Sequence, residues 1–154
     1  MTEYEIVEDC YTKLLNMDNI KEVHLEIPYM SKVIDMVIIE NNSRIITIEF
    51  KLQNWRKALN QAKVHKYGAD EAYICMPEPK QGFKEEFIKL LKKKGIGLFK
   101  YDSKQQIPFE KIVDAREEDN RWQPRVDLLK EMISKVKLAA QENEIAAVWN
   151  YGED

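Results

Sequence analysis

Two apolar segments rich in β-branched residues, 31–40 (SKVIDMVIIE) and 44–52 (RIITIEFKL), are separated by only three residues. Such segments favour β-strands, and strands joined by so short a connection pair antiparallel. The sequence therefore predicts a β-hairpin that turns near Asn42. Because side chains alternate across a strand, one face of the second strand is apolar throughout, whereas the other face ends in Glu49 and Lys51. The hairpin must place these two charges at the end of the face that begins with Ile45 and Thr47.

The first strand of the hairpin contains a further charge, Asp35. Asp35 lies seven positions before Asn42 and Glu49 lies seven positions after it, so the two carboxylates are expected to be near-opposite neighbours. Carboxylates in such positions repel each other, and partial burial increases the cost. A divalent cation removes this penalty, and hard oxygen ligands favour Mg²⁺ or Mn²⁺. Lys51, on the same face as Glu49, would then orient or deprotonate an attacking water.

The chain outside the hairpin alternates between helical and strand periodicity. Thr2 and Glu5 form a capping-box pattern at the first helix, and Gly68 and Gly95 end two later helices. We expect helices over 2–17, 54–67, 80–94 and 124–149, strands over 21–27, 71–77, 95–101 and 107–113, and a loop over 117–124. This order implies a partly parallel sheet with helices on its faces, so the predicted fold class is α/β.

Length and composition limit the class of protein. With 154 residues, the chain is expected to form one domain over 1–154 with a sizeable core. A formal net charge of −3 gives no global basic field, so affinity for nucleic acid requires a local patch. Cys10 and Cys75 lack the spacing of metal ligands and are expected to be buried thiols. No apolar run approaches the roughly 20 residues that span a bilayer, so we expect a cytoplasmic protein without a membrane partner.

The segment IDMVI around Asp35, followed after a turn by IEFK with Glu49 and Lys51, resembles the motif of the PD-(D/E)xK, or restriction-endonuclease-like, nuclease superfamily. The order helix, three-stranded meander, helix and strand over 2–76 is similar to the core of that superfamily. The resemblance implies such a core with added C-terminal helix and strand elements and a long last helix. It also implies a divalent-metal-dependent nuclease that hydrolyses phosphodiester bonds, with DNA as the favoured nucleic acid.

The same resemblance assigns roles to individual side chains. Asp35 and Glu49 would bind Mg²⁺ or Mn²⁺, and Lys51 would be the catalytic lysine. Gln61, on the helix after the hairpin, stands where many members place a glutamine that supports the site.

Many members of the superfamily carry an additional acid, for which this chain offers two candidates. Glu26 ends the strand before the hairpin, and Glu3 lies in the first helix. We favour Glu26 as an additional metal ligand, because a strand end beside the hairpin is closer to Asp35 than an N-terminal residue. The chain departs from the motif at Ile34, which stands where the superfamily often has proline.

Two alternatives stay open. A nuclease-fold module that is catalytically inactive would serve as a binding or regulatory subunit, which fits the small size of the chain. In an unrelated α/β domain, Asp35, Glu49 and Lys51 would form only a cross-strand ion pair worth about 0.2–1 kcal/mol. The apolar surroundings and the helix that follows favour a covered sheet, and therefore a site.

Other conspicuous residues are expected to have structural roles. His65 is expected on a helix surface, and Trp55 is expected to pack at a helix start. The last helix carries an apolar stripe that is expected to dock on the core rather than to form a dimer seam, with a homodimer left open. The stripe consists of Leu129, Ile133, Val136 and Ala140.

Overall fold

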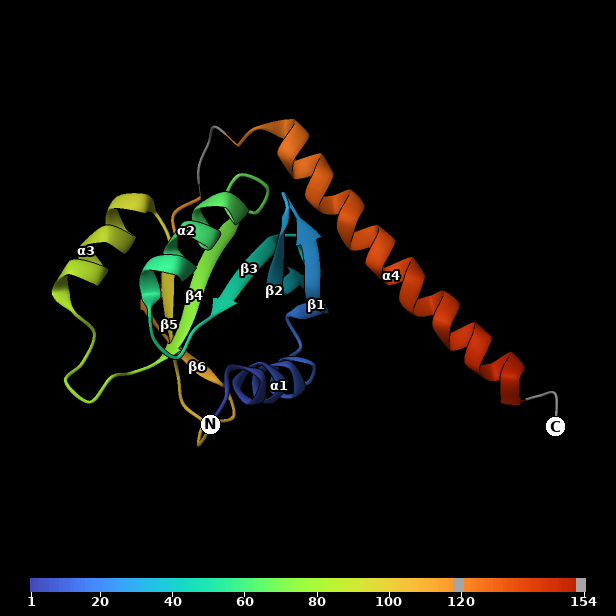
Figure 1. Ribbon diagram of the computed structural model, residues 1–154, viewed down its shortest axis with the longest axis horizontal. Helices are drawn as coiled ribbons and strands as arrows, with labels where there is room; N and C mark the ends of the chain where they lie inside the picture. Colours follow the sequence, from blue (N-terminus) through green and yellow to red (C-terminus); the bar gives the residue numbers. More distant parts are fainter. Residues whose placement is uncertain (118–120, 152–154) are drawn as a thin grey trace.

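The protein is described by a computed structural model that covers residues 1–117 and 121–151, with α4 side chains described up to residue 144. Within these residues the chain forms one six-stranded mixed sheet and four helices (Figure 1). The strands are β1 (Ile20–Tyr29), β2 (Lys32–Glu40), β3 (Ile45–Phe50), β4 (Glu71–Pro77), β5 (Gly97–Tyr101) and β6 (Phe109–Val113). The helices are α1 (Glu3–Leu14), α2 (Trp55–His65), α3 (Glu85–Lys94) and α4 (Gln123–Tyr151).

The strands lie in the sheet in the order in which they occur in the chain. β1, β2 and β3 form an antiparallel meander, and β6 pairs antiparallel with β5 at the other edge. β3, β4 and β5 are parallel, and α2 and α3 connect them. The predicted α/β class, the meander, the edge strand and the long last helix are therefore confirmed. Part of the loop predicted over 117–124 lies outside the described residues.

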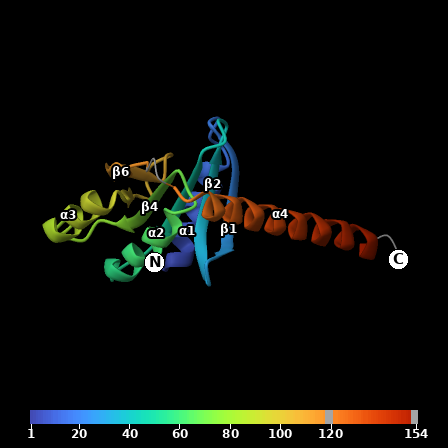
Figure 2. The same ribbon diagram turned by 90° about the horizontal axis from the view of Figure 1, so that it is seen from above.

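Helices cover both faces of the sheet. The apolar face of α1 packs against alternate residues of β2, β3, β4 and β5 on one side. α2 and α3 pack against the opposite face of β4 and β5, and α4 packs on that side of β1 and β2. Figure 2 shows the C-terminal part of α4 running out beyond β1, away from the sheet. Glu49 and Thr47 point to the face that α2 covers, because β3 alternates as expected.

Local sequence signals account for the helix ends. At α1, the Thr2 side chain accepts a hydrogen bond from the Glu5 backbone N–H and the Glu5 side chain accepts one from Thr2, so the predicted capping box is present. α3 ends at Gly95, whose φ of 70° lies in the left-handed region that glycine adopts without strain. Among the described helices, none is both long and apolar enough to cross a membrane.

The two cysteines are buried and free, as predicted. Cys10 of α1 and Cys75 of β4 lie side by side, and burial, followed by the neighbouring Cys10 thiol, raises the pKa of Cys75. This contact is part of the interface between α1 and the sheet.

Candidate functional site

The register of the β2–β3 hairpin brings two carboxylates together. Met36 pairs with Ile48, and continuing this register by one residue places Asp35 opposite Glu49, as the sequence predicts. Asp35 Oδ2 accepts a hydrogen bond from the backbone N–H of Phe50 at 2.9 Å. Glu49 Oε1 accepts one from the backbone N–H of Asp35 at 3.2 Å. Each carboxylate is therefore fixed by the main chain of the other strand.

Burial makes this carboxylate pair electrostatically costly. Glu49 is 1% exposed, and burial, followed by the charge of Asp35, raises its pKa to about 9. Burial also raises the pKa of Asp35, although the hydrogen bond from Phe50 and the charge of Lys51 oppose the shift. At neutral pH the pair therefore retains a proton that an exposed pair would lose. The pair is a buried site of negative charge that the surrounding protein neutralises only in part.

The pair fits a hard divalent cation in its donor chemistry. It offers buried carboxylate oxygens in mutual contact, and a cation would replace the shared proton. Among the residues that the structure describes, no group of three or more His, Cys, Asp or Glu side chains is arranged to hold a metal ion. Mg²⁺ is commonly held by one or two carboxylates, with waters and substrate phosphate as its other ligands. Asp35 and Glu49 match this type of site.

Lys51 follows β3 at the same end of the sheet. Its backbone N–H donates to the carbonyl of Cys75 at 3.1 Å, so the adjacent strand β4 fixes the lysine main chain. Its side chain is half-buried, and its charge partly offsets the rise in the pKa of both Asp35 and Glu49. The structure thus brings together the three residues of the predicted motif.

The additional acid near the pair is Glu3 rather than Glu26. Glu3 Oε1 accepts a hydrogen bond from the backbone N–H of Leu52 at 3.3 Å, and the charge of Glu3 contributes to the raised pKa of Asp35. Glu26 lies across from Asp35 in the β1–β2 register, but its side chain is exposed and its φ is 54°. This left-handed backbone interrupts strand alternation, so proximity in register does not bring the Glu26 side chain to the pair.

α2 contributes a histidine that we expected on the helix surface. His65 is 0% exposed, and its Nδ1 lies 3.5 Å from Oε1 of Glu49. The expectation was wrong because α2 packs on β3 through this helix face, where the His65 ring also meets the edge of Tyr29. Burial lowers the pKa of His65 to about 4, so the imidazole is neutral at pH 7.

Gln61 lies one helical turn before His65 on the same side of α2. The Oε1 atom of Gln61 and both ring nitrogens of His65 are buried, and they have no hydrogen-bond partner among the described residues. Buried polar atoms are normally paired, so Gln61 Oε1 and His65 Nε2 are available to bind a water or a ligand, whereas His65 Nδ1 already faces Glu49. The spacing of four residues between Gln61 and His65 is the sequence signal that points to His65.

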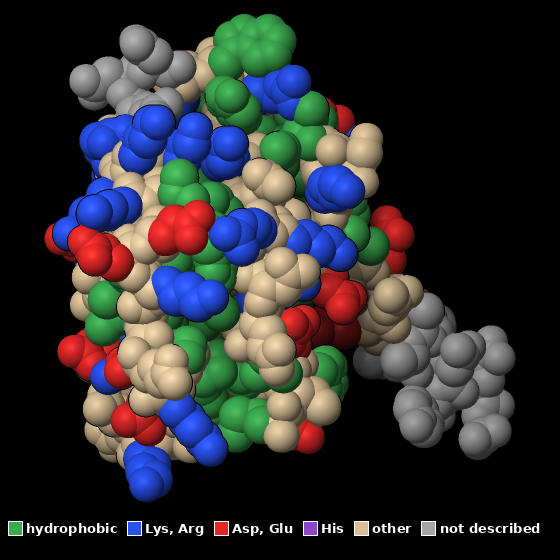
Figure 3. Space-filling view, turned by 60° about the vertical axis from the view of Figure 1, so that its left-hand side comes forward, with side chains coloured by type: hydrophobic (Ala, Val, Ile, Leu, Met, Phe, Trp, Pro, Cys, Tyr) green, Lys and Arg blue, Asp and Glu red, His purple; other side chains and the backbone are tan. Residues whose placement is uncertain are grey.

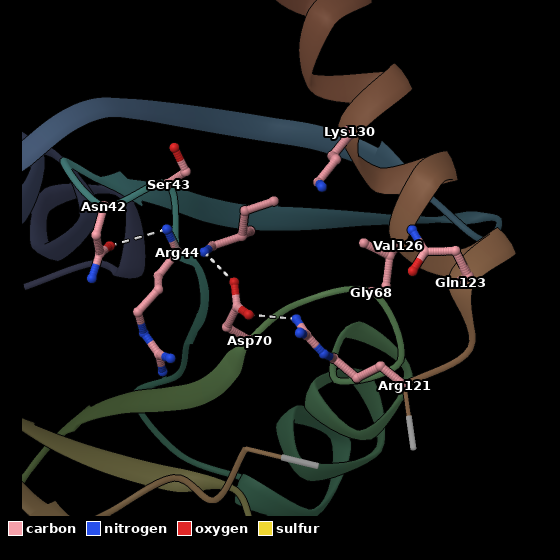
Figure 4. Close-up of a pocket in the computed structure, with 10 residues that line it drawn as sticks. Asn42, Ser43, Arg44, Gly68, Asp70, Arg121, Gln123, Val126 and Lys130 are labelled. Carbon is pink, nitrogen blue, oxygen red and sulfur yellow. Dashed lines mark hydrogen bonds and ion pairs between the residues drawn. The ribbon is translucent and has the colours of Figure 1, made fainter. Parts of the chain in front are cut away.

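A second polar site lies at the other end of β3, where the strand begins. A cavity of about 360 Å³ is lined by the β2–β3 turn, by the segment before β4 and by the start of α4 (Figure 4). Asp70 accepts hydrogen bonds from the backbone N–H of Ile45 and from Arg121. Arg44 forms ion pairs with Glu40, Glu71 and Glu117, and its contacts with Glu117 and then Glu71 raise its pKa. We assign these charges to the structure of the strand start rather than to chemistry.

Comparisons with known proteins agree on the fold. No model of a known protein family matches the sequence, and no curated protein is significantly similar to it. A protein of unknown function from Silicibacter pomeroyi, SPO1766, matches with a TM-score of 0.59 and 14% identity over 94% of both chains. A repair endonuclease from Pyrococcus abyssi matches with a TM-score of 0.51 and 19% identity over 67% of this chain and 48% of that chain. The fold is endonuclease-like.

An XisH family protein from Nostoc punctiforme also aligns with this chain, with a TM-score of 0.45 and 18% identity over 71% of this chain and 97% of that chain. At 14% and 19% identity, the matches to the Silicibacter pomeroyi protein and the Pyrococcus abyssi endonuclease describe the fold alone, and the chemistry follows from the site itself.

Proposed function

We propose that this chain is a PD-(D/E)xK-type nuclease that uses Mg²⁺ or Mn²⁺ to hydrolyse phosphodiester bonds in DNA. The observation that carries the proposal is the buried pair of Asp35 and Glu49, fixed by strand register beside Lys51. Burying two carboxylates with one shared proton costs stability, and a fold keeps such a conflict chiefly where function requires it. The endonuclease-like fold supports the proposal.

Each side chain of the site would have a separate role, which its position determines. Asp35 and Glu49 would hold the cation, since the main-chain hydrogen bonds engage one oxygen of each carboxylate and leave a second oxygen on each. When bound, the cation would stabilise the negative charge that develops on the phosphate. Lys51 would orient the attacking water and offset the charge of the scissile phosphate. Gln61 would hold a water at the helix side of Glu49 through its free Oε1.

Glu3 and His65 would act on the metal ligands rather than on the substrate. The charge of Glu3 reaches Asp35, and the neutral imidazole of His65 lies against Glu49. Groups that contact ligating carboxylates fix their orientation and tune their affinity for the metal ion.

The catalytically inactive module is the second candidate function. It is favoured by the lack, among the described residues, of a third acidic or histidine side chain arranged to hold a metal ion with Asp35 and Glu49. A site with only two protein ligands binds a cation weakly unless substrate phosphate completes the coordination. In that case the fold would retain the acidic pair but serve to bind a nucleic acid or another protein.

A cleavage assay with a matched control tests the proposal. Wild type, Lys51→Ala and Lys89→Ala are incubated with duplex, single-stranded, nicked and branched DNA in millimolar Mn²⁺. Lys89 is the control, because it lies 74% exposed on α3 and pairs with Glu85. Loss of a residue that acts on the nucleophile is expected to slow cleavage at least about 10²-fold, whereas Lys89→Ala cleaves as wild type does.

Metal binding separates catalysis from folding in this assay. Mn²⁺ should raise the melting temperature of Lys51→Ala as it does that of wild type, because the ligand pair is intact. Equal cleavage by wild type and Lys51→Ala would remove the lysine from the mechanism. Failure of wild type on all four DNA forms would favour the inactive module.

A further inference from the structure

A groove adjoins the candidate site at the carboxyl ends of β3 and β4. Its volume is about 740 Å³, within the range of about 300–1,000 Å³ of small-ligand pockets. The lining begins at Leu52, the residue after Lys51, and continues through the start of α2, the end of β4 and the segment 78–84 to the first turn of α3. In parallel sheets, ligands bind outside the carboxyl ends of the strands, which is where this groove lies.

Aromatic side chains form one part of the groove lining. Trp55 at the start of α2 stacks on Phe87 of α3, with ring centroids 4.6 Å apart and planes at 27°. Phe83 lies against Phe87 at 6.3 Å, and both Trp55 and Phe83 are half-exposed. The predicted packing of Trp55 is confirmed, but part of the ring faces the groove. Exposed faces of fixed aromatic rings are platforms on which nucleic acid bases stack.

Positive charge borders the same rings. Arg56 lies over the Trp55 ring, 4.4 Å from its centroid, and pairs with an exposed glutamate of α3. Lys80 and Lys84 line the groove and are exposed, and no ion pair joins either of them to another of the described residues. Among the described residues of the lining, the one acid is Glu78, which pairs with a lysine of β5 at 3.5 Å. The groove therefore presents uncompensated positive charge although the chain as a whole is acidic.

The face that Figure 3 shows carries many Lys and Arg side chains, interspersed with Asp and Glu side chains and with exposed hydrophobic surface. Interleaved cations and aromatic rings match a strand whose phosphates and unstacked bases are both exposed. In an intact duplex the bases are stacked inside, so a duplex would leave the aromatic rings of a groove of this size without a partner.

We infer that the groove binds an unpaired segment of a nucleic acid strand, with a base against Trp55 and Phe83 and the flanking phosphates against Lys80 and Lys84. The inference rests on the proposed function and narrows its substrate class to DNA with a single-stranded segment. Because the lining starts next to Lys51, a strand held there would carry its neighbouring phosphodiester toward Asp35 and Glu49. The groove would thus determine substrate specificity, and the metal-binding carboxylate pair would promote hydrolysis of the bound strand.

Binding in chelator tests the groove without requiring catalysis. The dissociation constants of a fluorescent single-stranded oligonucleotide and of the corresponding blunt duplex are measured by anisotropy for wild type, Phe83→Ala and Lys80→Ala/Lys84→Ala. Trp122→Ala is the control, because Trp122 is 57% exposed and lines no part of the groove. Phe83 is preferred to Trp55 for truncation, because Trp55 stacks on Phe87 with ring centroids 4.6 Å apart, whereas the ring of Phe83 is tilted and lies farther from Phe87, at 6.3 Å.

Specific magnitudes are expected for each variant. Wild type should bind the single strand more tightly than the duplex, and Phe83→Ala should weaken single-strand binding about 5- to 150-fold, the range for loss of one stacked base. The double lysine variant should lower the slope of log affinity against log salt by about 1.4, or about 0.7 for each phosphate contact to a single strand. Trp122→Ala should bind as wild type does.

The outcomes separate this inference from the proposed function. Equal affinity for both DNA forms, unchanged by the groove variants, overturns the inference even if Lys51-dependent cleavage is observed. Tight single-strand binding that the groove variants weaken, in a protein that cleaves none of the DNA forms, supports the groove and overturns the nuclease. A protein that binds neither form of DNA in chelator overturns the inference, and if it also cleaves none of the DNA forms in Mn²⁺, the proposed function fails as well.

Discussion

Glu49→Gln should alter how stability depends on pH. The glutamine keeps the shape of Glu49 and an oxygen that can accept the hydrogen bond from the Asp35 backbone N–H, but it does not ionise. In wild type the pKa of Glu49 rises from an ordinary value near 4.5 to about 9. The native state therefore keeps a proton that the unfolded chain has lost, and the free energy of unfolding falls as pH rises through this interval.

The effect of Glu49 on the free energy of unfolding is best measured above pH 6.5. Between pH 4 and 6.5, the lowered pKa of His65 acts in the opposite direction, because the unfolded chain binds a proton that the native imidazole excludes. From pH 7.0 to 8.5 only the carboxylate pair contributes strongly, with a limiting slope of about 1.4 kcal/mol per pH unit. Wild type should lose about 2 kcal/mol over this interval, or about 4–8 °C in melting temperature for a chain of this length.

Urea unfolding in chelator, followed by circular dichroism at several pH values, measures this dependence. The free energy of unfolding of wild type should fall across the window, whereas that of Glu49→Gln should stay nearly constant, so that the two curves diverge. Parallel curves for the two proteins would show that Glu49 is ionised in the native state. The account of the buried pair, and with it the main support for a metal site, would then fail.

Three further predictions concern the site and its support. In chelator, Asp35→Asn should melt no lower than wild type in calorimetry. Mn²⁺ at 100 times its dissociation constant should stabilise wild type alone, by about 2.7 kcal/mol. Stabilisation of both proteins would exclude Asp35 as a ligand. Gly95→Ala should lower the urea midpoint by the equivalent of about 1 kcal/mol, because the φ of Gly95 is 70° and an added Cβ would meet the Lys66 ammonium. An unchanged midpoint would show that alanine is tolerated at this helix end. Leu129→Ala should lower the free energy of unfolding by about 2–5 kcal/mol in the same assay, since the side chain is fully buried between α4 and the sheet. A decrease below about 1 kcal/mol would show that α4 is not firmly docked.

The sequence predicts the hairpin and its carboxylate pair because both depend on local rules. Strand alternation and the short turn fix which residues lie opposite, so Asp35 and Glu49 can be paired by counting from Asn42. The helices and strands follow in the same way from hydrophobic period, capping residues and glycine positions.

The remaining parts of the site depend on contacts between distant segments. Glu3 reaches the backbone of Leu52 only because α1 packs across the sheet, and no local period indicates this contact. His65 was misplaced because the rule for a lone polar residue on a helix predicts an exposed side chain, whereas packing of α2 on β3 buries it. The Glu26 backbone is a further case, since a positive φ is uncommon for glutamate and no local sequence pattern indicates it.

The connection between β4 and α3 and the paired strands that carry the carboxylates can change at different rates in evolution. The carboxylates lie on paired strands, where a shift of one residue would turn every side chain to the other face. Segment 78–84 forms a wall of the groove, and open space surrounds Gly82, whose φ is 79°. Insertions and substitutions in such a surface loop cost little stability. Under the proposed function and the inferred groove, substrate preference would depend on this loop while the carboxylate pair stays constant, so replacing the loop by one of different sequence should change the preference and leave the fold intact.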